Sequence, residues 1–166
     1  YLHVSLYVCL HVHTPIQAKD QEAKYYHDKL TKMGIEPSTA THMPDLKQGK
    51  NGISEYKTQQ NNPRYAAMVG SVDKSVGRVL AKLKDLNLED NTVVIFTSDH
   101  GGLSSRGPNK RELGTSNLPY RQGKGWLYDG GLRVPLIVKW PGKIAKNSTS
   151  LTQVTGTDHY PTILQL

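Results

Sequence analysis

The sequence is poor in cysteine, and it has no apolar run of the length that crosses a bilayer. Its one cysteine, Cys9, excludes an internal disulfide and a zinc centre built from several cysteines. A transmembrane helix needs about 20 consecutive apolar residues. No stretch of this chain approaches that length, and we therefore expect no membrane span.

The chain also lacks aromatic side chains interleaved with its basic ones. Its 166 residues, the size of one ordinary domain, carry a net charge of +7. This charge favours an anionic partner, which could be nucleic acid, a phosphorylated or sulfated molecule, or an acidic surface. Because the lysines and arginines are scattered, we interpret most of them as solvated surface residues and expect no nucleic-acid partner.

Hydrophobic periodicity predicts strands alternating with helices, and so an α/β fold. Apolar residues at every even position from Leu2 to Val12 predict a first strand. The polar stretch from 19 to 62 is interpreted as an excursion over the surface. The remaining expected elements are helices over 21–33 and 63–83, strands over 93–96 and 134–139, and a helix that starts at Thr157 or Asp158. Gly77, within the longest helix, suggests close approach to a neighbouring strand.

The stretch "NTVVIFTSDHGG" raises the first functional question, because an apolar strand stops at an acid, an imidazole and two glycines. Its continuous apolar run is typical of a strand covered on both faces. Asp99 and His100 then lie at the carboxyl end of that strand, where ligands bind in open α/β sheets. They could hold a metal, or Asp99 could cap the following loop beside an incidental histidine.

Three further side chains are weaker candidates when each is taken alone. His13 follows the first strand and could simply be hydrogen-bonded. Lys124 stands between two glycines, where it could meet an anion or be solvated. Arg133 is expected to pair with a carboxylate such as Asp129.

Five stretches, in this order, resemble the sulfatase family of the alkaline-phosphatase superfamily. They are "HTPIQA", "YAAMVGSVDKSVGRVL", "NTVVIFTSDHGG", "SNLPYRQGKGWLYDGGLRVPLIVKWPGKI" and "TDHYPTILQL". The resemblance implies a mixed, largely parallel sheet flanked by helices, of which residues 1–166 are an incomplete part of one catalytic domain. It also implies a sulfuric ester hydrolase with a formylglycine nucleophile and a divalent cation, Ca²⁺, acting on small-molecule or glycan sulfate esters. A periplasmic or secreted location follows from the same resemblance.

The resemblance assigns roles to four positions. Asp99 matches a carboxylate that binds the metal, and His100 matches a position that is asparagine or histidine in the family, at the metal. His13 matches a histidine that contacts the sulfate and assists the leaving oxygen, and Lys124 matches a lysine that holds a sulfate oxygen. Fixed cations and a metal suit this chemistry, because negative charge spreads over the sulfuryl oxygens as the ester bond breaks.

The sequence departs from the family in its nucleophile. The Cys/Ser-x-Pro-x-Arg motif and a preceding pair of metal-binding aspartates are both missing, and Asp129 replaces a glutamate. Tyr1 is not a natural initiator, and so we expect a piece of a longer protein, with the nucleophile upstream and the isolated chain inactive. Two alternatives remain open: a phosphatase or phosphodiesterase of the same superfamily, and a non-catalytic anion-binding fragment.

Overall fold

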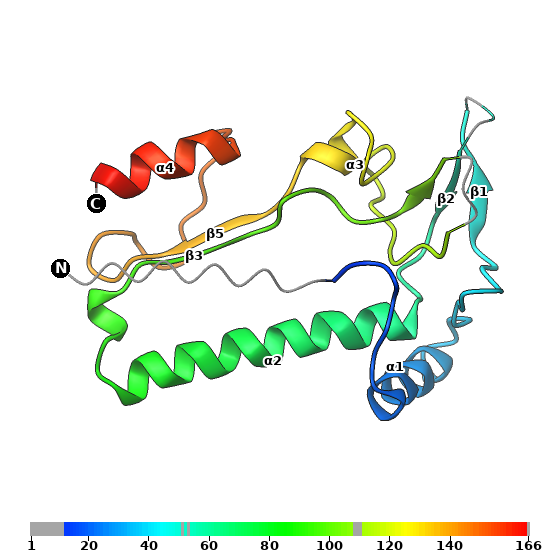
Figure 1. The fold of residues 1–166 in the computed structure, drawn as a ribbon, viewed down its shortest axis with the longest axis horizontal. Coiled ribbons are helices and arrows are strands. Elements are labelled where there is room, and N and C mark those ends of the chain that lie inside the picture. Colours follow the sequence, from blue (N-terminus) through cyan, green and yellow to red (C-terminus); the bar gives the residue numbers. More distant parts are fainter. Residues whose placement is uncertain (1–11, 51, 53, 108–110, 166) are drawn as a thin grey trace.

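The computed structural model describes residues 12–50, 52, 54–107 and 111–165, arranged as helices and short strands. A long helix runs beside a two-stranded ribbon, and a second sheet, of three short strands, lies near the start of that helix (Figure 1). In chain order the elements are α1 Asp20–Lys32, β1 Leu46–Gln48, β2 Glu55–Lys57, α2 Pro63–Asp85, the 3₁₀ turn η1 Glu89–Asn91, β3 Val94–Thr97, β4 Ser105–Arg106, α3 Asp129–Leu132, β5 Leu136–Lys139 and α4 Gly156–Gln165. The first strand expected from the sequence falls largely on residues 1–11, outside the described residues.

The helix α2 begins where the sequence predicts it, at Pro63, and is capped by Asn62. The Asn62 side-chain oxygen accepts a hydrogen bond from the backbone N–H of Tyr65 at 3.0 Å, which satisfies one of the free donors at the helix start. Proline at the first helical position lacks the donor that would otherwise stay unpaired. The predicted helices over 21–33 and 63–83 are both confirmed within a few residues.

The first two helices pack against each other through α2's glycine Gly70, not through Gly77. A Cβ placed on Gly70 would meet the hydroxyl oxygen of Tyr26 at 2.5 Å, whereas one on Gly77 would meet nothing within 4 Å. The expected close approach of Gly77 to a neighbouring strand was therefore wrong, since that residue is exposed on the helix surface. Glu22 of α1 adds an ion pair to Lys74 of α2, with Oε1 and Nζ 2.9 Å apart.

The three-stranded sheet takes two strands from the polar stretch 19–62 and its third strand from beyond β3. Its order is β1-β2-β4, and both pairings are antiparallel. Lys57 at the end of β2 is fully buried, and its ammonium group donates to Ser38 Oγ and Asp45 Oδ1, each at 2.9 Å, and to Asn61 Oδ1. This buried polar cluster joins β2 to the chain before β1 and to the start of α2.

The strand β3 pairs with β5 in the antiparallel sense, in register from Val94 opposite Lys139 to Thr97 opposite Leu136. The α/β class is confirmed. A largely parallel sheet is not confirmed, because the pairings that the described residues form are all antiparallel. Strand β3 is also not covered on both faces as expected: Ile95 and Phe96 are 37% and 41% exposed. The apolar side chains of β3 would need to be packed against other residues on both faces, and the described residues cover them only in part.

Helix α4 starts at Gly156, one or two residues before the predicted Thr157 or Asp158, so that Pro161 lies inside the helix and not in its first turn. Asp158 accepts a hydrogen bond from the backbone N–H of Thr155 at 2.7 Å. In Figure 1 this helix lies on the opposite side of the β3–β5 ribbon from α2. Among the described residues, no helix combines the length and apolar character that crossing a membrane requires.

Candidate functional site

The turn after β3 holds Asp99 and His100 side by side. Asp99 Oδ2 lies 3.1 Å from His100 Nε2, and His100 Nδ1 lies 3.0 Å from the carbonyl oxygen of Gly101. Because a carbonyl oxygen only accepts, Nδ1 carries a hydrogen. The Nε2 atom that faces the carboxylate then either carries a second proton or offers a lone pair beside a carboxylate oxygen. The second arrangement is that of two ligands of one cation.

Ser98 stabilises the turn after β3, and the side chains of Asp99 and His100 are open to solvent. The Ser98 hydroxyl donates to the carbonyl oxygen of His100 at 2.8 Å and so holds the turn from within. The Asp99 side chain is 81% exposed and that of His100 is 37% exposed. The pair is therefore accessible from solution.

His13 is an exposed side chain in the segment that leads to α1. Its Nδ1 lies 2.7 Å from the carbonyl oxygen of Thr14, and so Nδ1 carries a hydrogen and Nε2 is the atom left to meet a ligand. A histidine held in this way has a defined tautomer when neutral, and it offers a donor at Nε2 only when protonated.

The loop that carries Lys124 is fastened to the turn after β3. The backbone N–H of Lys124 donates to the carbonyl oxygen of Gly102 at 3.1 Å, and that of Gly101 donates to Gly131 O at 2.8 Å. A Cβ on Gly101 would overlap the carbonyl oxygen of Gly130, and one on Gly123 would overlap that of Gly102. Glycine at these positions is what allows the two backbones to approach so closely.

Two arginines stack on tyrosines around the same loop. The Arg121 guanidinium lies 3.9 Å from the centre of the Tyr128 ring, and that of Arg133 lies 5.0 Å from the centre of the Tyr120 ring. The expected pairing of Arg133 with the Asp129 carboxylate was wrong. Only backbone atoms join these two residues, with the N–H of Arg133 donating to Asp129 O at 2.8 Å.

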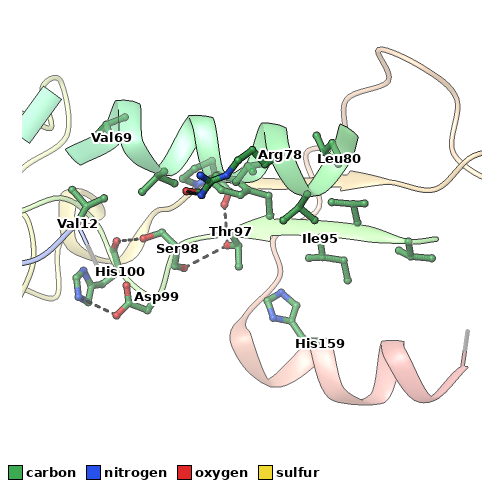
Figure 2. A pocket seen from close by; sticks show the side chains of 18 of the residues that line it. Val12, Val69, Arg78, Leu80, Ile95, Thr97, Ser98, Asp99, His100 and His159 are labelled. Carbon is green, nitrogen blue, oxygen red and sulfur yellow. Dashed lines mark hydrogen bonds and ion pairs between the residues drawn. The ribbon is translucent and has the colours of Figure 1, made fainter. Parts of the chain in front are cut away.

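One large cavity, of about 1580 Å³, runs between α2 and β3, and all four candidate residues line it. These residues are His13, Asp99, His100 and Lys124. The apolar wall comes from α2 and β3, with Val69 and Leu80 on the helix and Ile95 on the strand (Figure 2). Figure 2 also shows His159 of α4 directed toward β3. The cavity is long, and its lining alone does not bring His13 into contact with Asp99.

The donor set at the strand tip fits part of a cation site. A carboxylate oxygen and an imidazole nitrogen lie together there, and Ca²⁺ takes about six to eight oxygen ligands. Within the part of the chain that the structure describes, no group of three or more His, Cys, Asp and Glu side chains could hold a metal ion. Further ligands would have to come from other residues.

Some side chains that shape the site carry no recognisable sequence pattern. The Asn117 side chain reaches four acceptors around the Lys124 loop, and the Gln122 side chain donates to Ser54 Oγ at 2.9 Å. Such contacts depend on tertiary position. The only local signal was that the glycine-rich segment from 102 to 131 is too long for a simple connection.

The sequence of the chain matches one protein-family model and several known proteins. The family model described as Sulfatase matches residues 3–166. A protein named "Sulfatase" from Formosa agariphila is 43% identical over 128 residues, covering 68% of this chain. "Steryl-sulfatase" from Rattus norvegicus is 40% identical over 113 residues, again 68% of this chain, and "N-acetylgalactosamine-6-sulfatase" from Canis lupus familiaris is 40% identical over 103 residues, 62% of this chain.

These relatives are much longer than the matched segment. The match covers 22%, 20% and 19% of the three proteins, so that the chain spans about a fifth of their length. A crystal structure of Ps i-CgsB in complex with k-i-k-neocarrahexaose is 32% identical to this chain, with a TM-score of 0.49, and the match covers 78% of this chain and 21% of that one.

Proposed function

The chain belongs to the sulfatase family, and from this premise we propose that it supplies the metal- and sulfate-binding side of a site that hydrolyses sulfate esters. The observation that carries the proposal is the shared lining of one cavity by His13, Asp99, His100 and Lys124, which come from three separate parts of the chain. The nucleophile, a formylglycine made from Cys or Ser in a Cys/Ser-x-Pro-x-Arg motif, would come from sequence outside this chain, which contains no such motif.

In this proposal Asp99 and His100 hold a divalent cation, and Ca²⁺ is the first candidate because a carboxylate is a hard oxygen ligand. When bound, such a cation stabilises negative charge on the sulfuryl oxygens. The proximity of Asp99 Oδ2 and His100 Nε2, 3.1 Å apart, supports this role, in which Nε2 offers its lone pair to the cation. The imidazole is a softer ligand than calcium prefers, and the remaining ligands would be oxygens from other parts of the protein.

Lys124 would hold a sulfate oxygen, and His13 would act on the leaving oxygen. The hydrogen bond from the backbone N–H of Lys124 to Gly102 O anchors the main chain of this residue to the turn after β3, and its ammonium group would supply the cation that meets the sulfate. The contact of His13 Nδ1 with Thr14 O leaves Nε2 to donate a proton to the ester oxygen as the bond to sulfur breaks. This donation requires that His13 be protonated at the start of the step.

We also propose that β3 and β5 belong to a larger, mostly parallel sheet in the complete domain. Ile95, Phe96 and Ile137 support this, because they are apolar and 37%, 41% and 59% exposed. Apolar strands of this kind are normally covered on both faces. A structure of the full-length protein in which Ile95 and Phe96 still face solvent would contradict the proposal.

The experiment that tests the function is hydrolysis of 4-nitrophenyl sulfate and 4-nitrophenyl phosphate by the full-length protein, with and without a chelator. We expect release of 4-nitrophenol and sulfate from the sulfate ester, lost on chelation and restored by Ca²⁺. Faster hydrolysis of the phosphate ester would favour a phosphatase of the same superfamily. Binding of the sulfate ester without turnover would favour a non-catalytic anion-binding protein, which the missing nucleophile motif keeps as the second candidate.

A further inference from the structure

The side-chain amide of Asn117 lies at the point where three separate backbone segments meet. Its nitrogen Nδ2 is 2.9 Å from the carbonyl oxygen of Gly102, 3.2 Å from that of Gln122 and 2.9 Å from that of Gly130. The Ser104 hydroxyl oxygen is a fourth neighbour, at 3.0 Å. One side chain therefore joins the turn after β3, the residues before Lys124 and the short helix α3.

The contact with Gly102 connects Asn117 to both halves of the site. The Gly102 carbonyl oxygen accepts from Asn117 Nδ2 and also from the backbone N–H of Lys124 at 3.1 Å. Gly102 is two residues beyond His100 in the sequence. Asn117 thus fixes the acceptor that sets the position of Lys124 relative to the Asp99–His100 turn.

The packing around this point leaves little freedom for the loop to shift. A Cβ on Gly123 would meet the Ser104 hydroxyl at 2.5 Å and Asn117 Nδ2 at 2.8 Å, besides overlapping the carbonyl oxygen of Gly102. Gly123, the residue before Lys124, therefore packs directly against the Asn117 amide. A substitution at Asn117 would therefore shift the backbone of the neighbouring Lys124.

The chemistry of the contact requires a donor. All four neighbours of Nδ2 present oxygen, three of them as carbonyl groups that can only accept. An amide NH₂ group has two hydrogens to share among them. A carboxylate of the same shape would place a fifth oxygen in their midst, and an apolar side chain would leave the acceptors unpaired.

From this geometry we propose that Asn117 is a positioning residue, which holds Lys124 at a fixed place relative to Asp99 and His100. The inference rests on the proposed function, in which Lys124 meets the sulfate. It does not require Asn117 to touch the substrate. Asn117 acts by keeping the cation that stabilises developing charge in a preorganised place, and a displacement of about 1 Å in such a group can cost on the order of 100-fold in rate.

The test is a double-mutant cycle in the full-length protein, with kcat/KM for 4-nitrophenyl sulfate as the readout. Asn117→Ala alone is expected to lower kcat/KM by about 100-fold. In a Lys124→Ala background the same change is expected to cost less than about 3-fold, because the group that Asn117 positions is already gone. Losses that multiply independently would mean that Asn117 supports the fold in general, and would overturn the proposal.

Two further variants separate hydrogen bonding from packing. Asn117→Asp keeps the shape and is expected to be at least as harmful as Asn117→Ala; if it retains wild-type kcat/KM, the proposal is wrong. Gln60→Ala is the matched control, since its exposed amide makes only a 3.4 Å contact to Ser116 O near the same loop. If Asn117→Ala does not fold, Asn117→Ser, which keeps one donor, carries the same cycle.

Amide hydrogen exchange tests the positioning independently of any activity. In Asn117→Ala we expect the Lys124 and Gly130 amides to lose protection by about 10-fold or more, while the amides of α1 stay unchanged. If the wild-type protein hydrolyses no sulfate ester, the proposed function fails and exchange still decides the role of Asn117. Unchanged exchange at Lys124 would overturn the positioning role even in an active enzyme.

Discussion

The ammonium group of Lys57 lies 2.9 Å from the carboxylate of Asp45, and the two side chains are 0% and 3% exposed. Asp45 is also held by the backbone, since its Oδ2 accepts from the N–H groups of Thr58 and Gln59 at 3.1 and 2.9 Å. The pair is a buried salt bridge in which the ammonium group and both carboxylate oxygens have hydrogen-bond partners. Such a pair specifies one arrangement of the chain, because each charge is costly to bury without the other.

Removal of the cation should therefore be strongly destabilising. We expect Lys57→Met to lower the free energy of unfolding by about 3–5 kcal/mol, because Asp45 stays buried without its partner. Urea denaturation of the full-length protein measures this. The matched control is Lys24→Met, which breaks a 2.9 Å pair with Asp28 whose side chains are 74% and 48% exposed; it should change stability by less than about 0.5 kcal/mol. Equal losses would show that the Lys57 pair is no stronger than a surface pair.

The same pair predicts a loss of stability in acid. Burial raises the pKa of Asp45, but hydrogen bonds from Lys57 and from the backbone of Gln59 outweigh it, and the pKa lies below the ordinary value of 3.8. The contribution of such a group is complete above the unfolded-state pKa and is lost as the pH falls through the folded-state pKa, because the unfolded chain binds the proton first.

We therefore expect the free energy of unfolding to fall as the pH drops below about 4, and Asp45→Asn to flatten that dependence. Denaturation curves at a series of acidic pH values give the slope. Asp90→Asn, at an exposed carboxylate, is the control. A slope that Asp45→Asn leaves unchanged would assign the acid sensitivity to other groups.

Two glycines should respond in opposite ways to alanine. Gly101→Ala would force its Cβ into the carbonyl oxygen of Gly130, and so the turn that carries Asp99 and His100 must move away from the Lys124 loop. Gly77→Ala meets nothing within 4 Å on an exposed helical position. We expect the first change to lower stability and the second to raise it by about 0.5–1 kcal/mol, as for glycine-to-alanine changes inside helices. Thermal unfolding of both variants decides the matter, and a stabilised Gly101→Ala protein would contradict the close approach.

These elements also show what the sequence could and could not predict. Helix α2 was predictable because its signals are local: Pro63 at the start and apolar residues at three- and four-residue steps. A glycine in a helix, by contrast, does not say which neighbour comes close, and Gly70 has that role where Gly77 was expected. Nothing in a polar stretch marks Lys57 as buried, because its burial depends on partners up to 19 residues away.

The candidate site divides in the same way. Asp99 and His100 could be located because a strand end is a local feature of the sequence. Asn117 could not, because its partners are four acceptors on segments 5 to 15 residues away. The exposure of Ile95 also could not be foreseen, since an apolar strand shows only that cover is needed.

Metal binding should depend on Asp99 more than on acidic residues elsewhere. In the full-length protein we expect Asp99→Asn to weaken Ca²⁺ binding by at least the roughly 10- to 100-fold that loss of even an indirect partner of a metal costs. Isothermal titration calorimetry measures the affinity. Asp73→Asn, on the exposed surface of α2, is the control and should leave it unchanged. Equal affinities for the two variants would remove Asp99 from the metal site.

The last prediction separates a specific cation from the general positive charge of the chain. Lys124→Ala removes an ammonium group that lines the cavity and that, in the proposed function, meets the sulfate mainly as charge develops on its oxygens. Loss of one such preorganised contact typically costs about 100- to 1000-fold in rate. The loss should therefore appear in kcat for 4-nitrophenyl sulfate more than in KM, because the contact strengthens in the transition state.

Lys47→Ala is the matched control for Lys124→Ala, because it removes the same charge from an exposed position on β1 that does not line the cavity. It should leave kcat and KM within about 2-fold of the wild type, since a distant surface charge is largely screened by salt. Raising the ionic strength should not reduce the gap between the two variants, because the Lys124 contact acts at short range. Small, equal effects of both substitutions would mean that Lys124 is a surface lysine, and the assignment of the sulfate-binding residues would be wrong.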